Sequence, residues 1–279
     1  MKQAHVLIAG CGDLGCALGQ RLVADGLKVT GLRRSNAPLP DGMQAVKADV
    51  TQPQTLRGLA ALKPDILVYC VAADASTDDS YRAHYVDGLR NVLAALKNAA
   101  SLRHVFFVSS TRVYGQQTDD LLDETTPAIP VDFGGQRLLE AEALLNDLPC
   151  PGTALRLSGI YGPGRTRMLT LARQPQFWPA QNAWTNRIHR DDAAAFIAFL
   201  IHRVLNNATV DDCYVVTDNC PTPQYAVLMW LAEQLGVDVK GVKVPPVQGG
   251  KRLSNQRMCN LGFMLENPTY RTGYGNLLA

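Results

Sequence analysis

The stretch Ala4-His5-Val6-Leu7-Ile8-Ala9-Gly10-Cys11-Gly12-Asp13-Leu14-Gly15 decides the fold of this chain. An apolar run of strand type leads into a glycine-rich turn, and the turn opens a pattern of helical spacing that continues to Leu22. In such a unit Gly10 permits the tight turn, Gly12 lets the backbone approach a pyrophosphate, and Gly15 lets helix and strand pack closely. The helix N-terminus also offers free N–H groups to phosphate. The alternative is an ordinary glycine-rich turn, but this context favours a dinucleotide site made by Gly10, Cys11, Gly12, Asp13, Leu14 and Gly15.

Composition narrows the functional classes. The chain has 279 residues, of which 47% are hydrophobic and 19% charged, as in an ordinary globular protein with ample core. A net charge of +2 does not indicate nucleic acid or an anionic membrane as partner. No apolar stretch approaches the ~20 residues of a membrane-spanning helix, and the first strand leads into the glycine turn rather than a signal-peptide cleavage site. The seven cysteines form no C-x-x-C, so we expect no metal site and a reducing, cytoplasmic location.

Strand and helix patterns alternate through roughly the first 165 residues. We expect strands at 5–9, 28–32, 45–48, 65–71, 104–109 and 153–160, and helices at 13–25, 53–62, 80–100 and 133–146. The strands are rich in Val, Ile and Leu, which is typical of a parallel sheet covered on both faces. The sequence therefore predicts a doubly wound α/β Rossmann fold with ligands at the carboxyl ends of its strands.

The second part of the chain is less regular. After Tyr161-Gly162-Pro163-Gly164 we expect helices at 191–205, 223–235 and 254–261, a strand at 212–216 and a loop at 245–250. We therefore predict a dinucleotide-binding domain over residues 1–165 and a smaller substrate lobe over residues 166–279, partly interleaved. Tyr161, Trp178 and Trp184 can line a substrate pocket in this part or pack in its core.

The end of the second strand bears on the choice of cofactor. It reads Leu32-Arg33-Arg34-Ser35, where an acidic residue would bind ribose hydroxyls. Two arginines suit a 2′-phosphate, which predicts NADP, with NAD as the alternative; they can also be solvated loop residues. Asp49 can bind the adenine amino group or cap a helix. The remaining expected cofactor contacts are Val50, Val71, Ala72, Ala73 and Ser109.

Three segments resemble motifs of one protein family. Residues 108–115 (VSSTRVYG), 156–164 (RLSGIYGPG) and 186–193 (NRIHRDDA) are similar to segments of the NAD-dependent epimerase/dehydratase family, within the extended short-chain dehydrogenase/reductase superfamily. The matches follow the family's order from Leu7 to about Gly262. The resemblance implies a nicotinamide cofactor, a small-molecule substrate, and a homodimer formed through the helices at 80–100 and 133–146. The apolar face of the second helix can equally be required against the sheet.

Departures from the family pattern make the expected chemistry uncertain. The family's Tyr-x-x-x-Lys reads Phe133 to Arg137, and Tyr85 stands where the family has an Asn. Phe133 has no hydroxyl, and Arg137 offers only fixed charge and donors. The catalytic candidates are therefore Ser110, Arg137 and Tyr85, with Arg137 also expected to bind the cofactor ribose. The Tyr85 hydroxyl either replaces the missing one in part or fills space in an unused site.

The sequence is consistent with two functions, and a third fits the glycine turn less well. The first is an NADP-dependent oxidoreductase or epimerase-like enzyme for a small polar, nucleotide-sugar-like substrate. The second is a non-catalytic protein that binds NADP(H) and reports or responds to it. The third is a protein-interaction module that binds no cofactor. The retained Ser110 favours the enzyme, whereas the lost Tyr and Lys favour the sensor.

Overall fold

A computed structural model describes residues 3–116 and 118–279, which form two compact units. The first unit contains Met1–Gly115, Ala128–Arg156 and Ala194–Tyr214. The second contains Gln116–Pro127, Leu157–Ala193 and Val215–Ala279. Each unit is therefore assembled from three separate pieces of the chain.

A seven-stranded sheet organises the first unit, and its strands follow the order β11-β7-β5-β4-β1-β2-β3. The strands are β1 (His5–Ala9), β2 (Lys28–Arg33), β3 (Gln44–Lys47), β4 (Ile66–Tyr69), β5 (His104–Ser110), β7 (Gly152–Leu157) and β11 (Cys213–Val216). The strand β1 pairs in parallel with β2 and β4, and all residues of β1 and β4 are buried. The predicted doubly wound sheet is thus confirmed, and the strand order reverses between the parallel neighbours β1 and β4.

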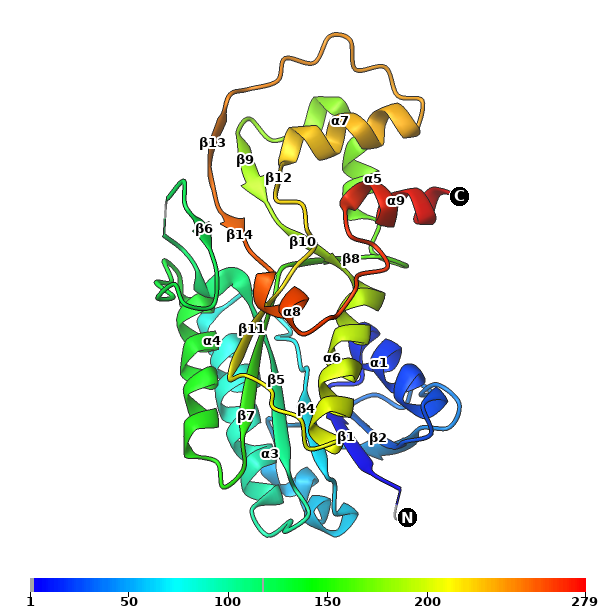
Figure 1. The fold of residues 1–279 in the computed structure, drawn as a ribbon, viewed down its shortest axis with the longest axis vertical. Helices are drawn as coiled ribbons and strands as arrows, with labels where there is room; N and C mark the ends of the chain where they lie inside the picture. The colour runs from blue at the N-terminus through cyan, green and yellow to red at the C-terminus, as the bar shows by residue number, and fades with distance from the viewer. Residues whose placement is uncertain (1–2, 117) are drawn as a thin grey trace. The chain divides into compact units, whose positions relative to one another are not determined.

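Helices cover both faces of this sheet (Figure 1). The helices α1 (Asp13–Ala24) and α6 (Arg190–Leu205) lie on one side, and α3 (Gly88–Leu96) and α4 (Phe133–Ala143) lie on the other. A 3₁₀ turn, η5 (Leu144–Asp147), follows α4, and η4 (Thr111–Val113) follows β5. Among the described residues, no helix is both long and apolar enough to cross a membrane.

Three local predictions were wrong. The helix expected at 53–62 is two 3₁₀ helices, η1 (Pro53–Leu56) and η2 (Leu59–Leu62), because Gly58 between them has a left-handed backbone with φ 88°. The strand expected at 153–160 stops at Leu157, and the next strand, β8 (Gly159–Tyr161), pairs with β10 (Arg187–His189) in a separate sheet. The loop expected at 245–250 contains β13 (Val247–Gly250).

The long helical segment after β4 contains a π-helix. It begins with α2 (Asp78–Tyr81), continues as the π-helix η3 (Arg82–Asp87) and ends with α3. The Gly88 amide donates to the carbonyl of Ala83, five residues earlier, and the Tyr69 hydroxyl donates to the carbonyl of His84. A Cβ on Gly88 would lie 2.5 Å from the Tyr69 hydroxyl oxygen, so only glycine allows this approach. The helix expected at 80–100 is thus confirmed, but its middle part has the wider hydrogen-bond spacing of a π-helix.

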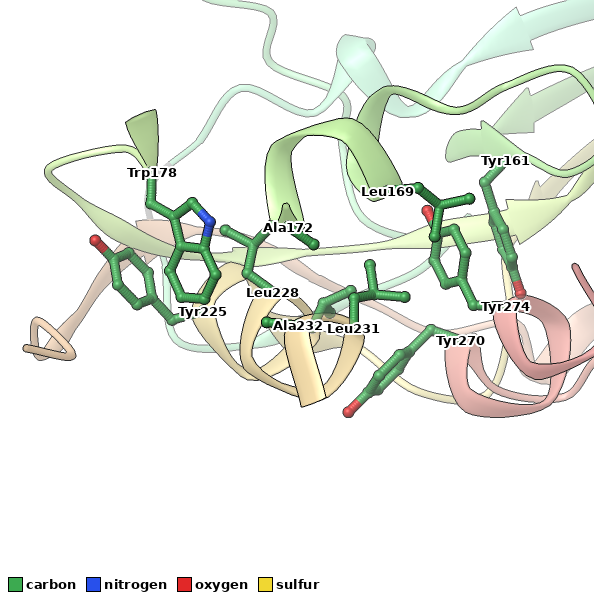
Figure 2. Packing of buried hydrophobic residues seen from close by; sticks show 11 residues of the cluster. Tyr161, Leu169, Ala172, Trp178, Tyr225, Leu228, Leu231, Ala232, Tyr270 and Tyr274 are labelled. Carbon is green, nitrogen blue, oxygen red and sulfur yellow. The ribbon is translucent and has the colours of Figure 1, made fainter. Parts of the chain in front are cut away.

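The second unit has its own core (Figure 2). The helices α5 (Arg167–Ala172), α7 (Gln224–Gln234) and α9 (Tyr270–Leu278) contribute to it, and Tyr161 and Trp178 are buried within it. These two rings therefore pack in a core. The remaining elements are short: β6 (Leu121–Leu122), η6 (Pro175–Phe177), β9 (Asn182–Thr185), β12 (Thr222–Pro223), β14 (Arg252–Leu253) and α8 (Gln256–Asn260). The strand β9 pairs with β12 and β13, and β6 pairs with β14.

Candidate functional site

The glycine turn is shaped by close backbone packing on one side and open space on the other. Gly10 has φ +96°, and a Cβ there would lie 2.6 Å from the amide nitrogen of Val71. A Cβ on Gly15 would lie 2.6 Å from the carbonyl oxygen of Gly10, whereas a Cβ on Gly12 would have nothing within 4 Å. Within the described part of the chain, no side chain caps the start of α1 at Gly12. This geometry suits a pyrophosphate beside Gly12.

A cavity of about 520 Å³ lies in the first unit at this turn. Its lining is Gly10, Cys11, Gly12, Leu32, Arg33, Arg34, Ser35, Ala48, Val50, Cys70, Val71 and His84. The structure therefore brings together seven of the predicted cofactor residues: Gly10, Cys11, Gly12, Arg33, Arg34, Val50 and Val71. The predicted residues Asp13, Leu14, Gly15, Asp49, Ala72, Ala73, Ser109 and Arg137 are not part of the lining. Five further residues line the cavity but were not predicted from the sequence: Leu32, Ser35, Ala48, Cys70 and His84.

The two arginines at the end of β2 have different environments. Arg33 donates from Nη1 to the carbonyl oxygens of Ala37 and Pro38, each at 3.3 Å. Its buried Nε has no hydrogen-bond partner in the described part of the chain. Arg34 makes a bidentate pair with Asp74, with Nη1–Oδ2 and Nη2–Oδ1 distances of 2.6 and 2.5 Å. Two cations at the cavity fit an anionic ligand group.

Asp74 has a second neighbour, His84 of the π-helix. The Nε2 of His84 lies 3.1 Å from Oδ2 of Asp74. The hydrogen bonds from Arg34 hold the pKa of Asp74 below its usual range, so this carboxyl stays ionised. Neither residue was predicted from the sequence, because Asp74 lies in a loop and His84 lies in the π-helix.

Asp49 has a local role. Its Oδ1 accepts hydrogen bonds from the amide of Thr51 at 2.9 Å and from the Thr51 hydroxyl at 2.8 Å. These bonds close the turn before η1, so Asp49 acts locally, much as a helix-capping residue does. The second carboxylate oxygen is outside these contacts.

The two serines that end β5 differ in availability. The Ser109 hydroxyl is buried and donates to Glu142 at 2.5 Å, within a network in which Arg156 pairs with Glu142 at 2.7 Å. The Ser110 oxygen accepts from the amide of Arg112 at 3.2 Å and caps η4. Accepting this bond leaves the Ser110 proton free to donate, so Ser110 is the more available of the two.

The family's Tyr and Lys positions are occupied differently here. Arg137 donates from Nε and Nη2 to Asp78 at 2.7 and 3.0 Å, and from Nη1 to Glu140 at 2.7 Å. These bonds raise the pKa of Arg137, so it cannot serve as a base. The ring of Phe133 packs edge-on against Tyr81, with centroids 5.4 Å apart.

Tyr85 is half-buried among other rings. Its ring lies 5.1 Å from that of Tyr81 and 6.5 Å from that of Phe107, centroid to centroid. Burial raises the pKa of Tyr85, and the nearby backbone amide of Ala73 partly opposes this. In the described residues no hydrogen bond joins the Tyr85 hydroxyl to Ser110. The hydroxyl lies beside the backbone of Ala73, in the loop after β4, and the ring packs against Tyr81 and Phe107.

A second tyrosine is placed beside a cation. Arg112 donates from Nη1 to the Tyr81 hydroxyl at 2.8 Å, and its Nε is 3.0 Å from both oxygens of Asp132. Its guanidinium lies over the rings of Tyr81 and Phe133, at 5.1 and 5.3 Å from their centroids. A Cβ on Gly134 would lie 2.6 Å from Nε of Arg112. In the sequence, the members of this cluster are Arg112 in the segment 108–115 and the run Asp132-Phe133-Gly134.

The fold and the glycine turn define a Rossmann-type protein with a cavity at the point where the strand order reverses. The chain belongs to the NAD dependent epimerase/dehydratase family, whose model matches residues 6–213. The resemblance drawn from the three motifs is thus confirmed. Groups of three or more His, Cys, Asp or Glu side chains that could hold a metal ion do not occur among residues 3–116 and 118–279.

Three relatives illustrate the range of similarity. A solved protein from Methylobacillus flagellatus, described by name as an NAD-dependent epimerase/dehydratase, is 54% identical with a TM-score of 0.91, over 99% of this chain and 98% of its own. Protein YeeZ of Escherichia coli K12 is 30% identical over 94% of this chain and 96% of its own. The enzyme WbmG of Bordetella bronchiseptica, in complex with NAD and UDP, shares the fold at 19% identity and a TM-score of 0.80, covering 99% and 94%.

Proposed function

We propose that this chain is an NAD(P)-dependent oxidoreductase or epimerase-like enzyme that acts on a small polar, nucleotide-sugar-like substrate. The observation that carries the proposal is the cavity of about 520 Å³, which is lined by the glycine turn and by Arg33 and Arg34. The complex of WbmG with NAD and UDP supports both the cofactor and the substrate class. The second unit, with most of residues 166–279, is proposed as the substrate lobe.

The proposed cofactor is NADP. Gly10 and Gly12 leave room for the pyrophosphate, and Arg33 and Arg34 stand where an acidic residue would select NAD. Val50 and Val71 line the same cavity and would contact the dinucleotide. A bound nicotinamide dinucleotide supplies or accepts a hydride equivalent. The chain itself contributes binding, orientation and the protons.

The proposed proton-handling groups lie at the end of β5 and on the helical segment formed by α2 and η3. The Ser110 hydroxyl is free to donate to a substrate oxygen. The Tyr81 hydroxyl accepts from Arg112, so its own proton is also available to a substrate oxygen. Tyr85 remains a candidate for the same role. Arg137 would bind ribose hydroxyls only after release from Asp78.

A specific observation favours the alternative of a non-catalytic NADP(H)-binding sensor. Phe133 lacks the family's hydroxyl, and Arg137 is engaged by Asp78 and Glu140. A protein that only reports NADP(H) would need the cavity but neither of these groups. A homodimer through the helices at 80–100 and 133–146 is compatible with either function.

One experiment separates the two functions. The purified chain is titrated with NADPH and NADH, following nicotinamide fluorescence, and then incubated with NADPH and a panel of keto sugars and nucleotide keto sugars. Saturable binding with substrate-dependent oxidation of NADPH supports the enzyme. Binding without turnover across the panel supports the sensor, and an absence of binding to either dinucleotide refutes both.

A further inference from the structure

The cavity carries a charged cluster that dinucleotide binding has to rearrange. Arg34 lines the cavity, and both of its Nη atoms are occupied by the two oxygens of Asp74. A 2′-phosphate would use the same Nη atoms, because a guanidinium binds carboxylate and phosphate through one bidentate geometry. Asp74 and a 2′-phosphate are therefore competitors for one site on Arg34.

His84 fixes Asp74 from the other side. The Nδ1 of His84 lies 2.8 Å from the carbonyl oxygen of Ser80, which can only accept, so Nδ1 carries a proton. The Nε2 is 3.1 Å from Oδ2 of Asp74, and this buried nitrogen has no aligned hydrogen bond in the described residues. The imidazole is 7% exposed and lines the cavity. The Nε2 edge of His84 thus faces Asp74, and the residue faces the cavity.

We propose that Asp74 holds the place of the 2′-phosphate on Arg34 in the free protein and thereby sets the discrimination between NADP(H) and NAD(H), with His84 retaining Asp74 when the phosphate displaces it. The inference rests on the proposed cofactor. It identifies Asp74 as a specificity-determining residue and His84 as a positioning residue. The Arg34–Asp74 pair is half exposed on each side, and such pairs are weak, so exchange with a phosphate is energetically accessible.

Substitution of Asp74 gives the first test. In Asp74→Asn the competitor and a negative charge near the phosphate are both removed, so the affinity for NADPH should rise by about fivefold, while the affinity for NADH stays within about twofold. The gain should vanish when the same substitution is made in an Arg34→Ala background. Asp87→Asn is the matched control, because Asp87 also pairs with an arginine (Arg90, at 2.7 Å) but does not line the cavity.

The role of His84 is tested in the same way. His84→Asn should lower the affinity for NADPH by about threefold in the wild-type background and leave it unchanged in the Asp74→Asn background, because its effect passes through Asp74. Titration with adenosine 2′,5′-bisphosphate against ADP repeats the comparison without the nicotinamide. Asp74→Ala is a second variant that removes the carboxylate, and circular dichroism checks the folding of each protein.

The possible results distinguish a failure of this inference from a failure of the proposed function. If Asp74→Asn leaves NADPH binding unchanged, or improves NADH binding equally, the inference is overturned while the proposed cofactor stands. Weaker NADH binding in Asp74→Asn would show that Asp74 binds ribose hydroxyls, which also overturns it. A wild-type protein that binds neither dinucleotide overturns the proposed function and the inference together.

Discussion

The Tyr69 hydroxyl, fully buried in β4, donates to the backbone carbonyl of His84 in the π-helix η3. This bond joins the centre of the sheet to the turn that carries a cavity-lining side chain. It also explains Gly88, since a side chain there would collide with the hydroxyl. π-Helical turns are rare and frequently occur at functional sites, and here the turn directs His84 toward Asp74.

Tyr69→Phe should therefore affect both stability and binding. The His84 carbonyl would lose its buried partner, at a cost of about 1–3 kcal/mol in the free energy of unfolding, and His84 would be less firmly placed. Denaturant unfolding and NADPH titration measure the two effects. Tyr214→Phe is the matched control, because that buried hydroxyl bonds Asp211 away from the cavity, so stability should fall with NADPH affinity unchanged. Equal NADPH affinities for wild type and Tyr69→Phe would contradict this account.

The arginines at the end of β2 predict a preference for NADPH over NADH. A charged hydrogen bond to phosphate contributes on the order of 1.5–3 kcal/mol, so the Arg33→Ala, Arg34→Ala double variant should lose at least tenfold in NADPH affinity. The affinity for NADH should change little. Isothermal titration of both dinucleotides gives the ratio. Equal affinities of the wild type for the two cofactors would refute the predicted preference.

Gly10 and Gly12 should respond differently to substitution. Gly12→Val should fold normally, since a Cβ there meets nothing within 4 Å, but it should abolish dinucleotide binding by filling the place of the pyrophosphate. Gly10→Ala should instead destabilise the fold, because φ is +96° and the Cβ would meet the backbone of Val71 at 2.6 Å. Thermal unfolding and NADPH titration of both variants test this. Normal binding by Gly12→Val would show that the turn does not hold the dinucleotide.

A buried histidine predicts how stability depends on pH. His104 of β5 donates from Nε2 to the Thr153 hydroxyl at 2.9 Å, because that hydroxyl gives its own proton to the carbonyl of Asp211 at 2.7 Å. Burial lowers the pKa of His104 from 6.5 to about 4. The unfolded chain therefore binds a proton first as the pH falls. Stability is full above about pH 6.5 and is lost progressively down to about pH 4, by up to roughly 3 kcal/mol.

The measurement is the free energy of unfolding between pH 4 and 7.5. A His104→Gln variant has no titrating ring and should flatten that part of the profile. Its stability at pH 7.5 should fall by the loss of packing with Phe106, whose ring centroid is 4.4 Å away. His202 is a suitable control, since it is partly exposed on the surface, where it contacts Asp25. A profile of unchanged slope in His104→Gln would contradict the assignment.

Much of the first unit could be predicted from local patterns. The strand, glycine turn and helix at the start occur as expected, because apolar runs and glycine spacing act over a few residues. The prediction of one helix at 53–62 was wrong. The apolar residues there have helical spacing, but Gly58 adopts a left-handed conformation that interrupts the helix. The π-helix depends on the Tyr69 hydroxyl, which lies fifteen residues before its acceptor. No local pattern contains such a contact.

Only part of the candidate site could be predicted from the sequence. Residues of the glycine turn and of β2 follow from motif position, and they line the cavity. Asp74 and His84 come from a loop and a helix whose spacing alone does not indicate their meeting. The Tyr81–Arg112 pair likewise joins α2 to the turn after β5. Side chains brought together by tertiary structure are what the sequence patterns could not supply.

Tyr81 and Tyr85 are the two tyrosines that are candidates for handling the proton. If the chain is an enzyme, Tyr81→Phe should reduce kcat by about 10²-fold or more with NADPH affinity nearly unchanged, since its hydroxyl is free to donate and is paired with Arg112. Tyr85→Phe is the matched comparison on the same helical segment. Its hydroxyl is held near Ala73 and burial raises its pKa, so the loss should be smaller. Steady-state kinetics on the first substrate identified gives both values. A larger loss in Tyr85→Phe would assign the role to Tyr85, and unchanged kcat in both would leave Ser110 as the remaining donor at this edge of the sheet.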